Sequence, residues 1–191
     1  GRRRESAEEA AFLRAYCANI GRAGEGERLN VKAEAAQRKE GIEETARRLR
    51  HGFLRRQMEA FGADCIALGH HMDDQVETML LRLGRGSGLT GLCAMRTYRP
   101  PLWRPLLSMR KAEILAALQA EAIPYCTDAS NESMDYARNR TRKILEALED
   151  IHPRFVKNAA RSAGLLQGEE DLLQSLARET LADLLTEEGL D

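Results

Sequence analysis

The chain has 191 residues, of which 43% are hydrophobic and 31% are charged, and its net charge is −1. This length allows one good core with a small appendage, and the composition is that of a soluble globular protein, which excludes disordered and fibrous classes. No stretch approaches the roughly 18–20 apolar residues of a membrane span and no apolar leader is visible, so we expect no membrane contact and a cytoplasmic location.

The first half of the chain predicts two helices with a short strand between them. A Ser-x-x-Glu capping box predicts a helix over about residues 7–20. Residues 29–31 give weak support for a strand. Apolar residues then recur at helical spacing over residues 42–61, and Gly62 ends that helix.

The middle of the chain predicts a buried strand followed by a helix. Residues 65–68 are apolar without alternation, which is typical of a strand covered on both faces in a parallel sheet. Apolar residues at helical spacing over 76–83 predict the helix. The glycine-rich loop 84–91 that follows lacks the Lys-Ser/Thr pair of a phosphate-binding loop and comes after a helix, so we interpret it as an ordinary loop.

The last third predicts mostly helix. Ser108 is the expected N-cap of a helix, and residues 123–126 suggest a last short strand. A polar loop over 128–135 leads to a helix over about 136–148. Pro153 is expected to open a longer helix through the acidic tail.

Strands that alternate with helices favour an α/β layered domain, and the end of the chain favours helices alone. We therefore expect an α/β domain with a parallel sheet over residues 1–150, large enough to be a catalytic domain, and a helical extension over 151–191. Charge follows the same division, because residues 1–165 carry 28 Lys and Arg against 22 acids, whereas residues 166–191 carry one Arg against eight acids. A mildly basic body permits phosphate contacts, but charge alone favours solvated helix faces as the explanation.

Two histidines and three carboxylates crowd into eight positions directly after the buried strand. They are His70, His71, Asp73, Asp74 and Glu77. Ligands of open α/β sheets gather beyond the carboxyl ends of strands. We expect Asp73 to cap the following helix, and Asp74 and Glu77 to share a face of its first turn. Mg²⁺ coordination, binding of an ammonium group and phosphate contact by histidine stay open, beside a purely structural role at the helix dipole.

A zinc site is a further alternative for this cluster. The four cysteines, at positions 17, 65, 93 and 126, form no Cys-x-x-Cys pair, and no His-x-x-x-His framework is present. We therefore expect buried thiols and no metal bound by protein ligands.

A second cluster places four cations in six positions, Arg138, Arg140, Arg142 and Lys143. On a helix, Arg138 and Arg142 share a face and Arg140 points away. Guanidinium groups suit phosphate or carboxylate recognition, and pairing with acids on a solvated helix face is the structural alternative.

Four motifs in the same order resemble those of bacterial tRNA(Ile)-lysidine synthases, which belong to the N-type ATP-pyrophosphatase or PP-loop family. They are the run from Leu68 to Leu92, Arg-Pro-Leu-Leu at 104–107, Asp-Ala-Ser-Asn at 128–131, and Tyr-Ala-Arg-Asn-Arg-Thr-Arg at 136–142. The resemblance extends from Ser6 to about Gly168. It implies a parallel-sheet fold of the adenine nucleotide alpha hydrolase kind.

The resemblance also implies a reaction. ATP, with Mg²⁺, adenylates the O2 of the wobble cytidine in a tRNA(Ile) with a CAU anticodon, and the ε-amine of free L-lysine then displaces AMP at C2. The product is lysidine. A homodimer is left open.

Residue roles follow from the same resemblance. Asp74 and Glu77 would hold the ammonium groups of lysine, and Arg142, or otherwise Arg138, would hold its carboxylate. His70 would face the α-phosphate, and Arg50 corresponds to another arginine near the nucleotide. Further candidates for tRNA contact are Arg85, Arg140 and Lys143.

The chain departs from the family at its start. It begins Gly-Arg-Arg-Arg without methionine and contains no Ser-Gly-Gly-x-Asp-Ser nucleotide loop. We therefore expect a piece that lacks the N-terminal nucleotide loop and is inactive alone. Two alternatives remain, a related PP-loop tRNA thiolase and a non-catalytic fragment of the same fold that binds tRNA or nucleotide.

Overall fold

Contacts within the chain divide it into two units, Gly1–Ile66 and Ala67–Asp191. The computed structural model describes the backbone of residues 2–126 and 137–187, and the side chains of residues 7–126 and 140–185. None of the helices in these ranges is long and apolar enough to cross a membrane.

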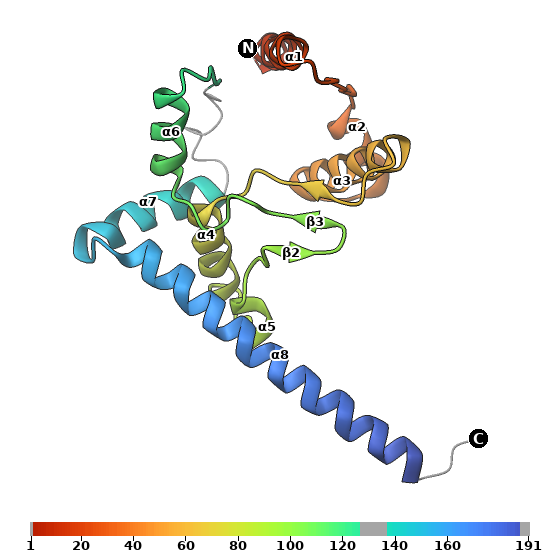
Figure 1. Cartoon of the computed structure of the whole chain (residues 1–191), viewed down its shortest axis with the longest axis vertical. Coiled ribbons are helices and arrows are strands. Elements are labelled where there is room, and N and C mark those ends of the chain that lie inside the picture. The colour runs from red at the N-terminus through yellow and green to blue at the C-terminus, as the bar shows by residue number, and fades with distance from the viewer. Residues whose placement is uncertain (1, 127–136, 188–191) are drawn as a thin grey trace. The chain divides into compact units, whose positions relative to one another are not determined.

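The first unit is helical, with α1 (Arg2–Asn19), α2 (Val31–Arg38) and α3 (Ile42–Ala60) (Figure 1). The helices predicted over 7–20 and 42–61 are confirmed, although α1 begins at Arg2 and Ser6 is therefore not its cap. The strand expected at 29–31 is wrong. Asn30 instead caps α2, because its Oδ1 accepts a hydrogen bond from the backbone N–H of Ala33 at 3.2 Å.

The second unit contains a small sheet and five helices within the described residues. Its elements are β1 (Ile66–Ala67, at the junction with the first unit), α4 (Met72–Leu83), α5 (Leu89–Leu92), β2 (Tyr98–Arg99), β3 (Leu102–Trp103), α6 (Lys111–Ala120), α7 (Ala137–Ile151) and α8 (Phe155–Glu187). The strand order is β1-β3-β2, and β2 pairs with β3 as an antiparallel hairpin. The backbone N–H of Leu68 donates to the carbonyl of Trp103 at 2.8 Å, which continues the pairing beyond β1.

Three features of this unit differ from the expectations. The strand expected at 123–126 is wrong, since the chain there has no regular structure. The N-cap of α6 is Arg110 and not Ser108, which lies in the turn before it. The short helix α5 and the β2–β3 hairpin were not predicted, because segments of two to four residues are too short to show a period.

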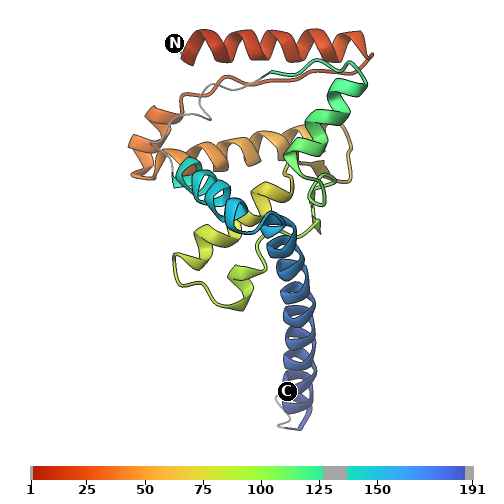
Figure 2. The same cartoon turned by 90° about the vertical axis from the view of Figure 1, so that its left-hand side faces the viewer.

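The core of the second unit joins α4, α7 and α8. It consists of Val76, Leu145 and Val156, all buried, with Met72, Leu80 and Phe155 among the apolar side chains around them. Val76 is fully buried. The N-terminal half of α8 covers α4 and α5, and its C-terminal half projects away from the other elements of this unit (Figure 2).

Two buried or half-buried glutamines hold the turn that follows α5. The side chain of Gln75, on α4, accepts from Met95 N at 2.8 Å and donates to Met95 O at 2.9 Å. Gln167, on α8, donates to the carbonyls of Cys93 at 2.7 Å and Met95 at 2.9 Å. Since these carbonyls lie away from regular structure, the two side chains supply the hydrogen bonds that burial requires.

Gly91 is the one position in this segment where the packing requires glycine. A methyl group at Gly91 would overlap the side chain of Ser87, with Ser87 Oγ only 2.9 Å away, whereas one at Gly88 would meet no atom within 4 Å. We predict that Gly91→Ala lowers the free energy of unfolding by about 1–3 kcal/mol through overpacking. Gly88→Ala is the matched control and is expected to stay within about 0.5 kcal/mol. Denaturant unfolding of both variants measures this, and equal effects would contradict the assignment.

Candidate functional site

The site is built around the first turn of α4, which follows β1 after the connection 68–71. Ile66 of β1 is buried but Ala67 is exposed, so the expected strand covered on both faces is wrong. His71 is the N-cap of this helix, in extended backbone conformation. Its Nδ1 accepts a hydrogen bond from the N–H of Asp74 at 3.3 Å, and the carboxylate of Asp74 accepts from the N–H of His71 at 3.1 Å. This reciprocal capping box satisfies two backbone donors at the helix start and buries Asp74, which is 9% exposed.

Asp73 does not cap α4, so that expectation is wrong. Its carboxylate instead accepts hydrogen bonds from the guanidinium of Arg110 at 3.0 Å and from the backbone N–H of Lys111 at 2.8 Å. Burial raises the pKa of Asp73, but the Lys111 N–H and the Arg110 charge outweigh that effect and hold the pKa below its ordinary value. Asp73 therefore joins α4 to the start of α6.

Arg110 also reaches α7, where it makes a two-pronged ion pair with Glu149. Arg110 Nη1 lies 2.8 Å from Glu149 Oε1, and Nη2 lies 3.0 Å from Oε2. The hydrogen bond to the Glu149 carboxylate is the largest influence on the pKa of Arg110. Together with Asp73 it outweighs desolvation, which lowers the pKa, and raises the pKa above its ordinary value. One guanidinium thus holds α4, α6 and α7 together, in the geometry that suits arginine best.

Glu77, one turn along α4, is almost wholly buried, with 1% of its surface exposed. Its Oε1 accepts a hydrogen bond from Arg142 Nε on α7 at 2.7 Å, which closes an ion pair between the two helices. The side chain of Arg142 is 31% exposed, so the pair opens to solvent on the arginine side. Buried carboxylates need such partners, because an unpaired buried charge costs several kcal/mol.

The structure therefore brings together three of the predicted site residues, Asp74, Glu77 and Arg142, in the second unit. His70 lies directly before them, half-buried, with its Nδ1 shielded from solvent. Arg138 is in α7, but its side chain falls outside the described residues, as does the motif at 128–131.

The other predicted residues are surface positions. Arg85 is exposed in the loop after α4, and Arg140 and Lys143 are exposed on α7. Arg50 is exposed on α3 and belongs to the first unit.

Sequence reasoning missed Arg110 and Glu149. Arg110 takes the N-cap that was expected at Ser108, and nothing in the sequence marks it as the cap. Glu149 is one acid among several on α7 and carries no signal of its own.

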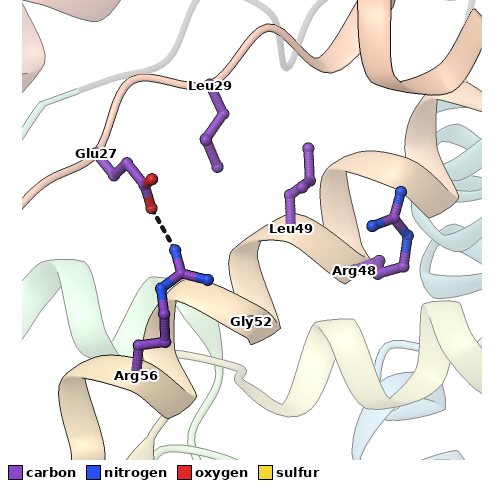
Figure 3. Close-up of a pocket in the computed structure, with 6 residues that line it drawn as sticks. All are labelled: Glu27, Leu29, Arg48, Leu49, Gly52 and Arg56. Carbon is purple, nitrogen blue, oxygen red and sulfur yellow. Dashed lines mark hydrogen bonds and ion pairs between the residues drawn. The ribbon is translucent and has the colours of Figure 1, made fainter. Parts of the chain in front are cut away.

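The first unit has a pocket of about 400 Å³ beside α3 (Figure 3). Its lining comprises Glu27, Leu29, Arg48, Leu49, Gly52 and Arg56. Arg56 is paired with Glu27, and Arg48 with Glu34 and Glu40. None of the predicted site residues lines this pocket, so the α4 cluster is the better candidate.

No group of three metal-binding side chains occurs among the residues whose side chains are described. All four cysteines are free thiols, but only Cys93 is buried and Cys126 is exposed, so the expectation of buried thiols is wrong except at Cys93. Burial, followed by the neighbouring Glu170, raises the pKa of the Cys93 thiol, which makes it less reactive than an ordinary cysteine.

Residues 1–148 match the profile of the family described as the PP-loop domain. The chain belongs to the PP-loop family. This confirms the predicted fold class, an α/β domain of the ATP-pyrophosphatase kind followed by helices.

Curated relatives cover almost the whole chain. A tRNA(Ile)-lysidine synthase of Bacillus subtilis (strain 168) is 36% identical over 190 residues, which are 97% of this chain and 40% of the relative. One from Bacteroides thetaiotaomicron is 32% identical over 187 residues, 97% of this chain and 44% of the relative. The chain thus spans less than half the length of these relatives.

Among solved structures, the chain is similar to the U34-tRNA thiolase NcsA from Methanococcus maripaludis, which was solved with its [4Fe-4S] cluster. The TM-score is 0.55 at 19% identity, over 83% of this chain and 55% of that chain. A likeness at this identity supports the shared fold and no shared chemistry.

The Asp73–Arg110 contact predicts a specific dependence of stability on pH. Because the folded-state pKa of Asp73 lies below its ordinary 3.8, the contact stabilises the fold above that pH and loses its effect as pH falls through the folded-state value. We expect Asp73→Asn to lower the free energy of unfolding by about 1–3 kcal/mol at pH 7. The difference from wild type should shrink below pH 3.8.

Denaturant unfolding between pH 7 and pH 2.5 measures this difference. Glu146→Gln, at an exposed acid on α7, is the matched control and should stay near wild type throughout. A difference between wild type and Asp73→Asn that is constant with pH would show that the carboxylate charge is not what stabilises this contact.

Proposed function

We propose that the chain is the catalytic part of a tRNA(Ile)-lysidine synthase. This enzyme ligates L-lysine to C2 of the wobble cytidine of a tRNA(Ile) with a CAU anticodon, using ATP and releasing AMP and pyrophosphate. Membership of the PP-loop family and the names of the curated relatives support the reaction class. The observation that carries the proposal is the buried Glu77–Arg142 pair beside Asp74 on the first turns of α4.

This arrangement has the charges that recognition of an amino acid requires. Asp74 and Glu77 stand three residues apart on one face of α4 and offer carboxylates to ammonium groups. Arg142 offers a guanidinium to a carboxylate, and its partly exposed side faces outward from the buried pair. In the proposed complex the lysine is held between α4 and α7, with its amine positioned for attack.

The start of α4 is unsuited to phosphate, because two acids in its first turn offset the positive end of the helix dipole. By resemblance, His70, which lies between β1 and α4, is assigned to the nucleotide, and the role of Arg50 in the first unit rests on the same resemblance alone. When bound, ATP supplies the adenylyl group that makes the cytidine O2 a leaving group. The described residues offer no ligand cluster for Mg²⁺, and no step is assigned to it.

The roles of the chain's own residues follow from this assignment. Asp74 and Glu77 bind and orient the lysine, and Arg142 fixes its carboxylate, so the amine meets C2 in a reactive geometry. Arg85, Arg140 and Lys143 are exposed cations, and we assign them to tRNA phosphates.

A tRNA thiolase of the cytidine-thiolating type is less well supported. Such enzymes carry paired cysteines for an iron–sulfur cluster, whereas the cysteines here are dispersed and free. Iron–sulfur absorbance in anaerobically purified full-length protein would overturn the choice of a ligase.

We predict that the full-length protein incorporates labelled lysine into tRNA(Ile) and that Asp74→Ala or Glu77→Ala removes this activity. Asp74→Asn keeps an acceptor for the His71 N–H and removes only the charge. It is expected to lower kcat/KM for lysine by about 10- to 100-fold, as loss of a hydrogen bond to a charged group does. Initial rates at varied lysine concentration measure this.

Glu146→Ala is the control, because it removes an exposed acid from α7 and should keep wild-type rates. Thermal unfolding of each variant separates loss of binding from loss of fold. Normal incorporation by both alanine variants would remove the site assignment, and no incorporation by the wild-type full-length protein would remove the proposed function itself.

A further inference from the structure

The β2–β3 hairpin exposes two large aromatic side chains on one face. Tyr98 and Trp103 are directly opposite each other in the antiparallel pair, so their side chains lie on the same side of the hairpin. Tyr98 is 54% exposed and Trp103 is 43% exposed. Neither aromatic residue is needed for the core described above, and adjacent exposed aromatics usually mark a binding surface.

Along the sequence, the segment that contains this hairpin has charge of one sign, although Arg96 and Arg110 in that segment pair with acids from other segments. From Thr78 to Ala112, 35 consecutive residues contain no Asp or Glu and seven Arg or Lys. Arg99 belongs to the hairpin itself and is exposed. Within the part of the chain that the structure describes, its side chain makes no ion pair. Arg99 follows Tyr98 in β2, so its side chain leaves from the opposite face of the hairpin, at the edge of the sheet. Exposed aromatic rings on one face and a cation at the edge of the same hairpin suit a polyanion that also presents planar rings.

The hairpin is held rigidly, so it can act as a preformed platform. The backbone N–H of Arg104 donates to the carbonyl of Thr97 at 2.8 Å, and its guanidinium donates to the carbonyl of Arg96 at 2.9 Å. Arg96 in turn pairs with Glu170 and Asp171 on α8. These contacts anchor both ends of the hairpin and leave its aromatic face uncovered.

The hairpin is also connected to the candidate site. The carbonyl of Trp103 accepts from Leu68 N, just before the His70–His71 pair, and the N–H of Met72 donates to the carbonyl of Met109 at 2.8 Å. The segment that leaves β3 therefore runs to the first turn of α4. A ligand on the hairpin would be within the same unit as the proposed lysine site.

We propose that Tyr98 and Trp103 form a stacking surface for an unpaired base of the substrate RNA, with Arg99 holding an adjacent phosphate. Unpaired bases are recognised by aromatic stacking, which tolerates any base, while arginine supplies the electrostatic attraction. This inference rests on the proposed function, because it takes tRNA as the substrate. It adds a surface that binds a base of the tRNA other than the reacting cytidine.

The test is binding of a tRNA(Ile) transcript with a CAU anticodon to the full-length protein and its variants. Trp103→Ala and Tyr98→Ala are each expected to raise the Kd by about 5- to 100-fold, the loss of one stacked base. Trp103→Phe should retain most of the affinity, because it keeps an aromatic face. Phe61→Ala, at an aromatic residue of the first unit that is 58% exposed, is the matched control and should leave the Kd unchanged.

Salt dependence separates stacking from charge. Arg99→Ala is expected to reduce the slope of log K against log salt by about 1, whereas Trp103→Ala should leave that slope unchanged. In an anticodon stem-loop with 2-aminopurine at unpaired positions, binding should quench fluorescence at one position, and Trp103→Ala should remove that quenching.

The inference would be overturned if Trp103→Ala and Tyr98→Ala fold and bind tRNA with wild-type affinity. It would also be overturned if these variants lost self-association or binding to another protein while their affinity for tRNA was unchanged. The two proposals fail separately. If tRNA binding needs the hairpin but no lysine is incorporated, the proposed function is wrong and the stacking surface stands. If lysine is incorporated and the hairpin variants keep the wild-type KM for tRNA, only the stacking surface is wrong.

Discussion

An ionised carboxylate that is buried without a partner costs several kcal/mol, and the first two turns of α4 carry three carboxylates that are buried or partly buried. Each carboxylate accepts hydrogen bonds from a different segment of the chain. Asp74 accepts from the cap of its own helix, Asp73 from Arg110 and the start of α6, and Glu77 from Arg142 on α7. The positions of α6 and α7 relative to α4 therefore follow largely from the need to neutralise this turn.

The rest of α4 is fixed by neutral contacts. Val76 packs against Leu145 and Val156, and Gln75 is committed to the backbone of Met95. The apolar face of α4 thus packs in the core, the Gln75 amide holds the turn after α5, and the first turn carries the charged side chains. Because packing and hydrogen bonding hold the helix body, the carboxylates at its start are held in place without depending on a ligand.

Apolar periodicity was enough to predict α3, α4 and the C-terminal helices, and the density of acids after the predicted strand was enough to locate the candidate site. The roles inside the site were less predictable. Asp73 has the residue type and the place of a helix cap, but an arginine 37 positions later competes for its carboxylate, and one sequence shows no sign of that contact. The β2–β3 hairpin escaped prediction because its strands have two residues each, so neither has a period to detect.

The distribution of charge along the chain gives a physical reason why one protein would bind both proposed substrates, lysine and tRNA. Around the first turn of α4, four carboxylates, including Glu149, meet the two guanidinium groups of Arg110 and Arg142, which leaves an excess of two negative charges. In the proposed complex that excess attracts lysine, whose two ammonium groups and one carboxylate give it a net charge of +1. The next 35 residues carry only positive charge, which suits a polyanion and repels free lysine. The proposed ligase, which joins a cationic amino acid to RNA, needs both fields close together.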